Sequence, residues 1–270
     1  MIEPTKSAFY SKENLEKVTY AIRETRVVMD HYGRQFNGTK PSKRIRALVD
    51  LFNRMANNLD GVEILLDHPQ ITYPYIPFQA INTLLRPVLH DVFVAFYIGS
   101  IKNEDHAETE LDILNLDLYT ALTTIKNEFK EYKEFDSSLF DRITSEFIES
   151  NPELFQDREK RNAKSLRPEG HVLGNGKIVV SNVLKVLKHT DLMQLKELYA
   201  MYRLLSQYEH YSPWFQKSFA YKDDFEFGTI VQTMYSAIYA IVLIGGAISM
   251  DDKGMYSLLR RAEELKGIIQ

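Results

Sequence analysis

Apolar residues recur every three or four positions along most of this sequence, which is the period of an α-helix. The most regular stretch lies within residues 45–66, where the steps alternate between three and four. Its apolar residues are Ile45, Leu48, Phe52, Met55, Leu59, Val62 and Leu66. Because this heptad pattern persists for only about three heptads, we expect it to pack inside the molecule and not as a coiled coil between chains.

Similar stripes elsewhere predict an all-α fold, a helical bundle of about eight to nine helices. Glycine (12) and proline (9) are sparse among the 270 residues, which favours long helices. The apolar share of 44% and the charged share of 26% are typical of a folded soluble protein. We expect a single domain over residues 1–270, in which residues 1–67 could form a helical subdomain.

Residues 228–250 carry no charge and are long enough to span a bilayer. The run nevertheless contains Thr229, Gln232 and Ser236, and no basic cluster flanks it to orient it in a membrane. We therefore expect a central apolar helix of a soluble bundle, with membrane association as the weaker alternative. The N-terminus has no basic segment followed by an apolar run, so we expect a cytoplasmic protein.

The sequence holds no cysteine, which excludes disulfides, thiolate catalysis and cysteine-ligated zinc or iron–sulfur centres. The seven histidines include no HExxH pair, and no pair of carboxylates recurs at ligand spacing. We therefore expect neither a metal nor a cofactor. The net charge of −4, from 33 basic and 37 acidic residues, argues against a dedicated binder of duplex DNA.

A polar stretch over about residues 151–177 interrupts the helical pattern and predicts a loop. It is either a solvated surface loop or a lid. The basic residues in its middle that could bind a ligand are Arg158, Arg161, Lys164 and Arg167.

The helix predicted over residues 192–213 has one face that is apolar at first and polar later. Along that face lie Leu192, Leu195, Tyr199, Arg203, Ser206 and His210. If the face turns inward, the three polar side chains need partners, because burying them unpaired is costly. Those partners are either structural, such as Asp91 for Arg203, or a ligand.

A second polar pair, Arg86 and His90, is spaced one turn apart on an apolar helix predicted over about residues 78–101. Pro87 lies between them, which predicts a kink or a late start of this helix. Both side chains are candidate binding residues.

Residues 84–98 read LLRPVLHDVFVAFYI and residues 199–213 read YAMYRLLSQYEHYSP. The first places Arg86 on an apolar helix, and the second places Ser206 and His210 as Ser-x-x-x-His in a tyrosine-rich helix near a proline. This combination resembles a family of uncharacterised all-helical bacterial proteins. His90 stands where that family tends to have an acid.

Six residues separate Arg203 from His210, and this spacing resembles the Arg-x(4–6)-His motif of the HEPN superfamily. These helical domains include metal-independent ribonucleases of toxin and phage-defence systems. The resemblance implies that His210 acts as acid and base on a ribose 2′-hydroxyl, while Arg203 stabilises the phosphate. It also implies a homodimer and a cognate antitoxin-like partner protein. Leu204 departs from the motif, since a polar residue commonly follows the arginine.

Two functions stay open. In the first, the chain is a helical binding or interaction protein whose polar Arg/Ser/His cluster either lines a pocket, for which RNA or a nucleotide is a candidate ligand, or forms a buried network. The residues of this cluster are Arg86, His90, Arg203, Ser206 and His210. In the second, it is a HEPN-like ribonuclease with Arg203 and His210 as catalytic residues and Ser206 beside them. They differ in one requirement, because the nuclease needs His210 open to a groove.

Overall fold

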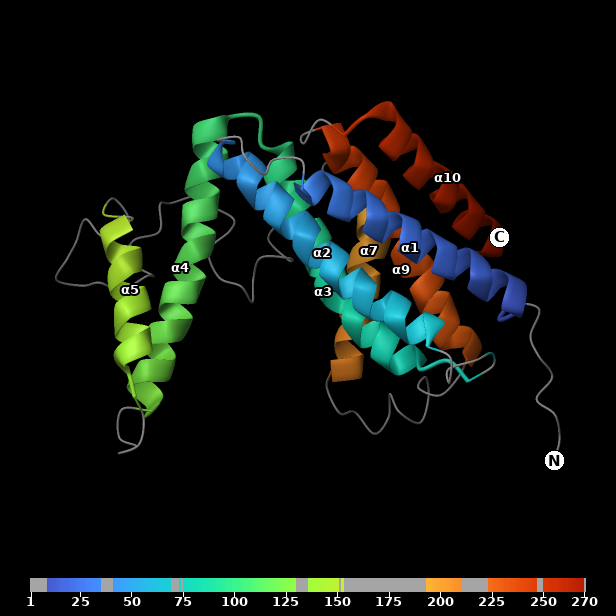
Figure 1. The fold of residues 1–270 in the computed structure, drawn as a ribbon, viewed down its shortest axis with the longest axis horizontal. Helices are drawn as coiled ribbons and strands as arrows, with labels where there is room; N and C mark the ends of the chain where they lie inside the picture. Colours follow the sequence, from blue (N-terminus) through green and yellow to red (C-terminus); the bar gives the residue numbers. More distant parts are fainter. Residues whose placement is uncertain are drawn as a thin grey trace. The chain divides into compact units, whose positions relative to one another are not determined.

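The computed structural model is helical, with no strand among the residues that it describes (Figure 1). Those residues are 9–34, 41–68, 73, 75–129, 136–150, 152, 193–209, 223–246 and 250–269. The predicted all-α helical bundle is confirmed. The polar loop expected over about residues 151–177 lies, apart from Pro152, outside the described residues.

The described helices are α1 (Lys12–Arg34), α2 (Lys43–Asp67), α3 (Phe78–Ser100), α4 (Glu104–Phe129), α5 (Ser138–Ser150), α7 (Met193–Glu209), α9 (Asp223–Gly245) and α10 (Asp252–Ile269). The chain divides into two compact units, Met1–Ser100 with Thr190–Gln270 and Ile101–His189. Within the first unit, α1 and α2 pack against each other, α2 packs on α3, and α1 packs on α10. The single-domain organisation stays a prediction.

Helices α3 and α9 form the centre of the first unit. They pack against each other and against α7, and α9 also contacts α10 (Figure 1). Both helices are long and apolar enough to cross a membrane, but most of each apolar stretch is buried inside the chain itself. Helix α9 is thus the central apolar helix expected near the C-terminus.

Helix α3 begins at Phe78 and continues through Pro87 to Ser100, so the late start expected from the proline is wrong. A proline inside a helix removes one backbone hydrogen bond and costs about 3 kcal/mol. The surrounding side chains Leu85, Val88 and Leu89 are fully buried, and their burial offsets that cost. The continuous helix keeps Arg86 and His90 one turn apart.

The heptad pattern of α2 faces the interior of the first unit. Its central residues Leu48, Phe52, Met55, Leu59 and Val62 are fully buried. Helix α2 packs on α1 and on α3. The expected packing inside the molecule is therefore confirmed.

Ion pairs join the polar edges of α1 and α2. Arg23 Nε lies 2.7 Å from one carboxylate oxygen of Glu63, and Arg26 Nε lies 2.6 Å from the other. Arg23 also pairs with Asp67. Burial raises the pKa of the Glu63 carboxyl, but the hydrogen bonds from both arginines outweigh it and hold the pKa below its ordinary value of 4.5.

We expect Glu63→Gln to make the free energy of unfolding less dependent on pH in the acidic range. Because the pKa of Glu63 is lowered in the folded chain, its contribution is complete above pH 4.5 and is lost as the pH falls through the folded pKa. The variant should be less stable by about 1 kcal/mol at pH 7 and should approach the wild type at low pH. Urea unfolding between pH 2.5 and pH 7 measures this difference, and a constant difference over that range would contradict it.

Helix α9 buries a hydroxyl without a hydrogen bond. Thr233 is fully buried, and its Oγ1 has no partner within the described part of the chain. We expect Thr233→Val to raise the free energy of unfolding by about 1–2 kcal/mol, because valine has the same shape and no group to desolvate. Thermal unfolding measures the gain. Ser236→Ala, which removes a hydroxyl near the Gln232 side chain (3.3 Å), serves as the contrast and should not stabilise.

In the second unit, α4 packs against α5. The ring of Tyr119 in α4 stacks on the ring of Phe147 in α5, with centroids 5.8 Å apart. Lys126 of α4 pairs with Asp141 of α5. Ser137 precedes α5, and its hydroxyl donates to Asp141 at 2.8 Å. Helix α5 ends at Ser150, two residues before Pro152.

Candidate functional site

Aromatic contacts fix the position of α7 on α3. Leu198 and Leu205 of α7 are fully buried in the first unit. The rings of Tyr199 and Tyr202 meet the buried ring of Phe93 nearly edge-on, with centroids 6.5 and 6.2 Å away. This packing places Tyr202 beside the polar residues of α3.

The structure brings Arg86 and His90 together around Tyr202. The guanidinium carbon of Arg86 lies 5.3 Å from the centroid of the Tyr202 ring, within the range of a cation–π contact. The imidazole of His90 lies 6.4 Å from the same ring, centroid to centroid. Both α3 side chains are half-buried, and the Nε atom of Arg86 is fully buried, so any solvent contact of this guanidinium is through its other atoms.

A buried carboxylate continues this cluster toward α2. Asp91 is 0% exposed, and its Oδ1 lies 3.5 Å from His90 Nδ1 and 3.3 Å from Arg54 Nη2. Its Oδ2 is buried without a hydrogen-bond partner in the described part of the chain. When His90 is neutral, a proton on Nδ1 directed at Asp91 leaves Nε2 as an acceptor. Arg54, Arg86, His90, Asp91 and Tyr202 are called the α3–α7 cluster below.

The predicted partner of Asp91 was Arg203, and this prediction is wrong. Asp91 pairs with Arg54 and His90, whereas Arg203 is exposed. The hydroxyl of Ser206 donates to the backbone carbonyl of Arg203 at 2.7 Å, a local bond within α7.

The face of α7 that carries Arg203 therefore does not turn into the core. A neighbouring stripe of the same helix, Leu198, Tyr202 and Leu205, also has helical spacing and holds its two fully buried leucines. Of the predicted face, Tyr199 contacts Phe93 of α3, whereas Arg203 is exposed. The neighbouring stripe is the more apolar of the two, so burying it removes more apolar surface from water.

The other predicted site residues fall outside the described part of the chain. They are His210, Arg158, Arg161, Lys164 and Arg167. Their roles as catalytic and binding residues stay predictions.

Two members of the α3–α7 cluster were missed by reading the sequence. Tyr202 belongs to a tyrosine-rich stretch, and the motif in that stretch gives this tyrosine no role of its own. Arg54 carries no local signal, because an arginine on the polar side of an amphipathic helix usually faces water. Only the packing of α2 on α3 places it beside Asp91.

The chemistry of the α3–α7 cluster suits an anion or a planar group. The cluster contains two guanidinium groups, and guanidinium groups donate charge-assisted hydrogen bonds to anions. The Tyr202 ring adds a π-face beside them. Among the described residues, no group of three or more histidine, cysteine, aspartate or glutamate side chains could hold a metal ion.

Comparison of the chain with protein-family models, with curated proteins and with solved structures found no match.

Proposed function

We propose that the chain is a cytoplasmic helical binding protein that recognises a phosphate-bearing ligand, a nucleotide or a strand of RNA, through the α3–α7 cluster. The observation that carries the proposal is the placement of Arg86 and His90 on one tyrosine ring. Arginine donates paired hydrogen bonds to phosphate oxygens, and histidine adds a donor when protonated. A base can stack on an exposed part of an aromatic ring.

The charge around Asp91 supports an anionic ligand. The buried carboxylate holds Arg54 and His90 on one side of α3, and Arg86 approaches Tyr202 one turn away. Two arginines and a histidine thus lie within two helical turns of one another, although the chain has a net charge of −4. An anion at this place would gain from charge-assisted hydrogen bonds.

Fluorescence anisotropy tests this function with fluorescein-labelled single-stranded RNA, and a fluorescent ATP analogue tests it for a nucleotide. Arg86→Ala should weaken binding about tenfold, equivalent to about 1.4 kcal/mol. Tyr202→Phe should retain binding because it keeps the ring, and Tyr202→Ala should lose it. Binding should also weaken as salt increases.

Arg46→Ala is the matched control for charge, because Arg46 is an exposed arginine on α2 outside the cluster. Circular dichroism of each variant checks that the helices are intact. An equal loss of binding in Arg46→Ala and Arg86→Ala, or no binding of either ligand by the wild type, would refute the proposal.

A second function, a HEPN-like metal-independent ribonuclease, is favoured by the exposure of Arg203 on α7. An exposed guanidinium is accessible to an RNA backbone, as a phosphate-stabilising residue must be. In this proposal His210 is the acid and base on the ribose 2′-hydroxyl, and a homodimer brings two motifs together.

Incubation of the purified chain with labelled single-stranded RNA in EDTA tests the ribonuclease. Cleavage that persists in EDTA and disappears in both Arg203→Ala and His210→Ala supports it. His68→Ala, at an exposed histidine after α2, is the control and should cleave normally. RNA binding without cleavage would leave the binding function and remove the enzyme.

A further inference from the structure

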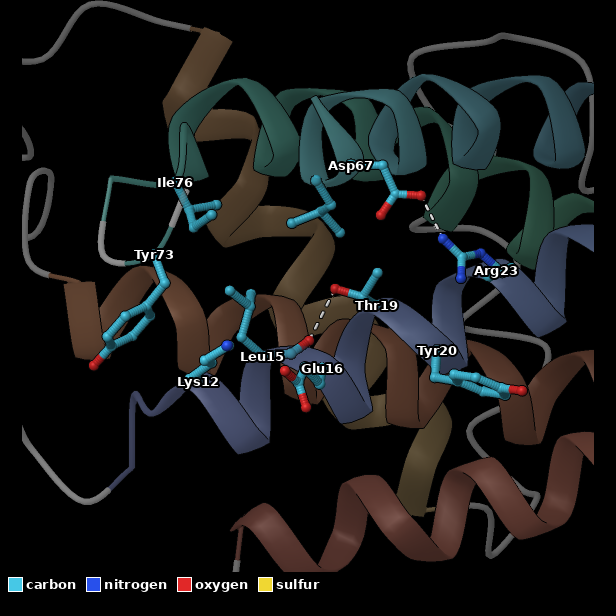
Figure 2. A pocket seen from close by; sticks show the side chains of 10 residues that line it. Lys12, Leu15, Glu16, Thr19, Tyr20, Arg23, Asp67, Tyr73 and Ile76 are labelled. Atoms are coloured by element: carbon cyan, nitrogen blue, oxygen red, sulfur yellow. Dashed lines mark hydrogen bonds and ion pairs between the residues drawn. The ribbon is translucent and has the colours of Figure 1, made fainter. Parts of the chain in front are cut away.

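A groove of about 630 Å³ lies between α1, the end of α2 and the segment before α3, away from the residues of the α3–α7 cluster. Figure 2 shows side chains of α1 along one wall, with Asp67 opposite and Tyr73 and Ile76 at one end. This volume is within the range of sites that hold small ligands or short peptide segments. The name α1–α2 groove refers to this feature below.

The lining of the α1–α2 groove presents apolar surface to solvent. Leu15, Leu66 and Ile76 all line it, and each is only half-buried. Tyr20, also in the lining, is 53% exposed, and Tyr75 beside the lining residue Ile76 is 82% exposed. Tyrosine is enriched among the residues that contribute most to binding at protein interfaces, and the half-buried aliphatic side chains offer apolar surface beside it.

The charged side chains that line the α1–α2 groove form ion pairs at one end of it only. Arg23 pairs with Asp67 and Glu63, so that end is already neutralised (Figure 2). Lys12 and Glu16 line the groove one turn apart, and neither has an ion pair with a described residue.

A neighbouring pair on α1 has its charges in the opposite order, with the acid first, which is the order that favours pairing along a helix. Glu13 and Lys17 have the same i, i+4 spacing, and their charged groups lie 2.7 Å apart. Lys12 and Glu16, both in the described part of α1, form no ion pair with each other. They leave one positive and one negative group available beside the apolar lining residues Leu15, Leu66 and Ile76.

We propose that the α1–α2 groove binds a short linear peptide of a partner protein. Apolar side chains of this peptide cover Leu15, Leu66 and Ile76, while one acidic and one basic side chain pair with Lys12 and Glu16. The span from Lys12 to Arg23 is about 16 Å along α1. An extended peptide covers that length with about five residues.

A peptide fits these features better than a simple anion or cation. A simple ion would pair with either Lys12 or Glu16 and would leave the apolar lining of the groove exposed to water. A peptide provides both charges and apolar side chains in one chain, and Tyr20 offers it a rigid contact surface.

Selection of a phage-displayed random heptapeptide library on the full chain tests this proposal. The expected sequences carry an acid and a base two positions apart, with apolar residues beside them, because Lys12 and Glu16 are about 6 Å apart along α1 and two extended residues cover about the same length. A fluorescein-labelled synthetic copy of the most enriched sequence is then titrated by fluorescence anisotropy. The charge-swapped variant K12E/E16K should bind it at least tenfold more weakly, and a peptide with its own two charges exchanged should restore the affinity.

The matched control is E13K/K17E, which exchanges the same kinds of charge at the same spacing on α1 but outside the groove lining. It should bind the original peptide as the wild type does. Because all four side chains are on the solvent side of α1 or only half-buried, both variants should fold, and circular dichroism checks this.

Three outcomes would overturn the proposal. The library yields no enriched sequence, the enriched peptide binds K12E/E16K and wild type equally, or E13K/K17E weakens binding as much as K12E/E16K. Displacement of the peptide by free lysine or glutamate at comparable concentration would also overturn it, because the site would then recognise a charge and not a peptide.

Discussion

Replacing Phe93 by alanine is expected to lower the free energy of unfolding by about 3–5 kcal/mol. Phe93 is fully buried in α3, and the rings of Tyr199 and Tyr202 rest against it nearly edge-on. The substitution removes the buried ring and leaves a cavity between α3 and α7 that the surrounding helices fill only in part. It also removes two aromatic contacts that hold α7 in place.

Urea unfolding followed by circular dichroism measures this loss. Leu243→Ala is the control, because Leu243 is an apolar residue of α9 in the same unit but is largely exposed. It should change stability by no more than about 0.5 kcal/mol. A loss below about 1 kcal/mol in Phe93→Ala would contradict the packing described for α3 and α7.

The same substitution connects stability to the proposed ligand site. Tyr202 contacts Phe93 and also lies beside Arg86 and His90. When Phe93 is lost, the Tyr202 ring has more freedom, so Phe93→Ala should weaken RNA or nucleotide binding even under conditions in which the chain is still folded. Phe93→Leu refills part of the cavity and should recover much of the stability.

Removing Arg54 should cost about 2–3 kcal/mol, because Asp91 would lose a cation while it stays fully buried. The cost is below that of breaking a wholly buried ion pair because the Arg54 side chain is 62% exposed and water screens it. His90 would then be the remaining described ion-pair partner of the carboxylate.

Thermal and urea unfolding of Arg54→Ala test this effect, with Arg46→Ala as a matched control from the exposed face of α2. Asp91→Asn added to Arg54→Ala should recover part of the loss, since a neutral amide is cheaper to bury than a carboxylate. If Arg46→Ala and Arg54→Ala are equally destabilised, the Arg54–Asp91 contact contributes nothing specific.

The helical architecture could be predicted because its signal is local and repeated. The spacing of Leu48, Phe52, Met55 and Leu59 demands a helix with one buried face, and the structure buries that face. The charge-free run that includes Ile230 and Ile238 similarly required a helix surrounded by others. The spacing of Arg86 and His90 was also determined by the sequence, because positions four apart on a helix are neighbours.

The rotation of α7 could not be predicted in the same way. Its sequence contains two apolar stripes, one leading from Tyr199 to Arg203 and the other from Leu198 to Leu205. Local spacing is satisfied by either, and the choice depends on how the whole surface of α7 fits α3 and α9, which leaves Leu198 and Leu205 buried and Arg203 exposed. The expectation that Arg203 faces the interior therefore failed.

The amino-acid sequence alone determined the helices, the buried side of α2 and the central place of α9, since each follows from the period of apolar residues along one segment. Tertiary structure alone decided that Arg54 reaches Asp91, that Tyr202 joins Arg86 to His90, and that Lys12 and Glu16 flank an open groove. These neighbours come from different helices, or depend on how two helices meet. Their proximity is set by the packing of whole surfaces, which no single segment encodes.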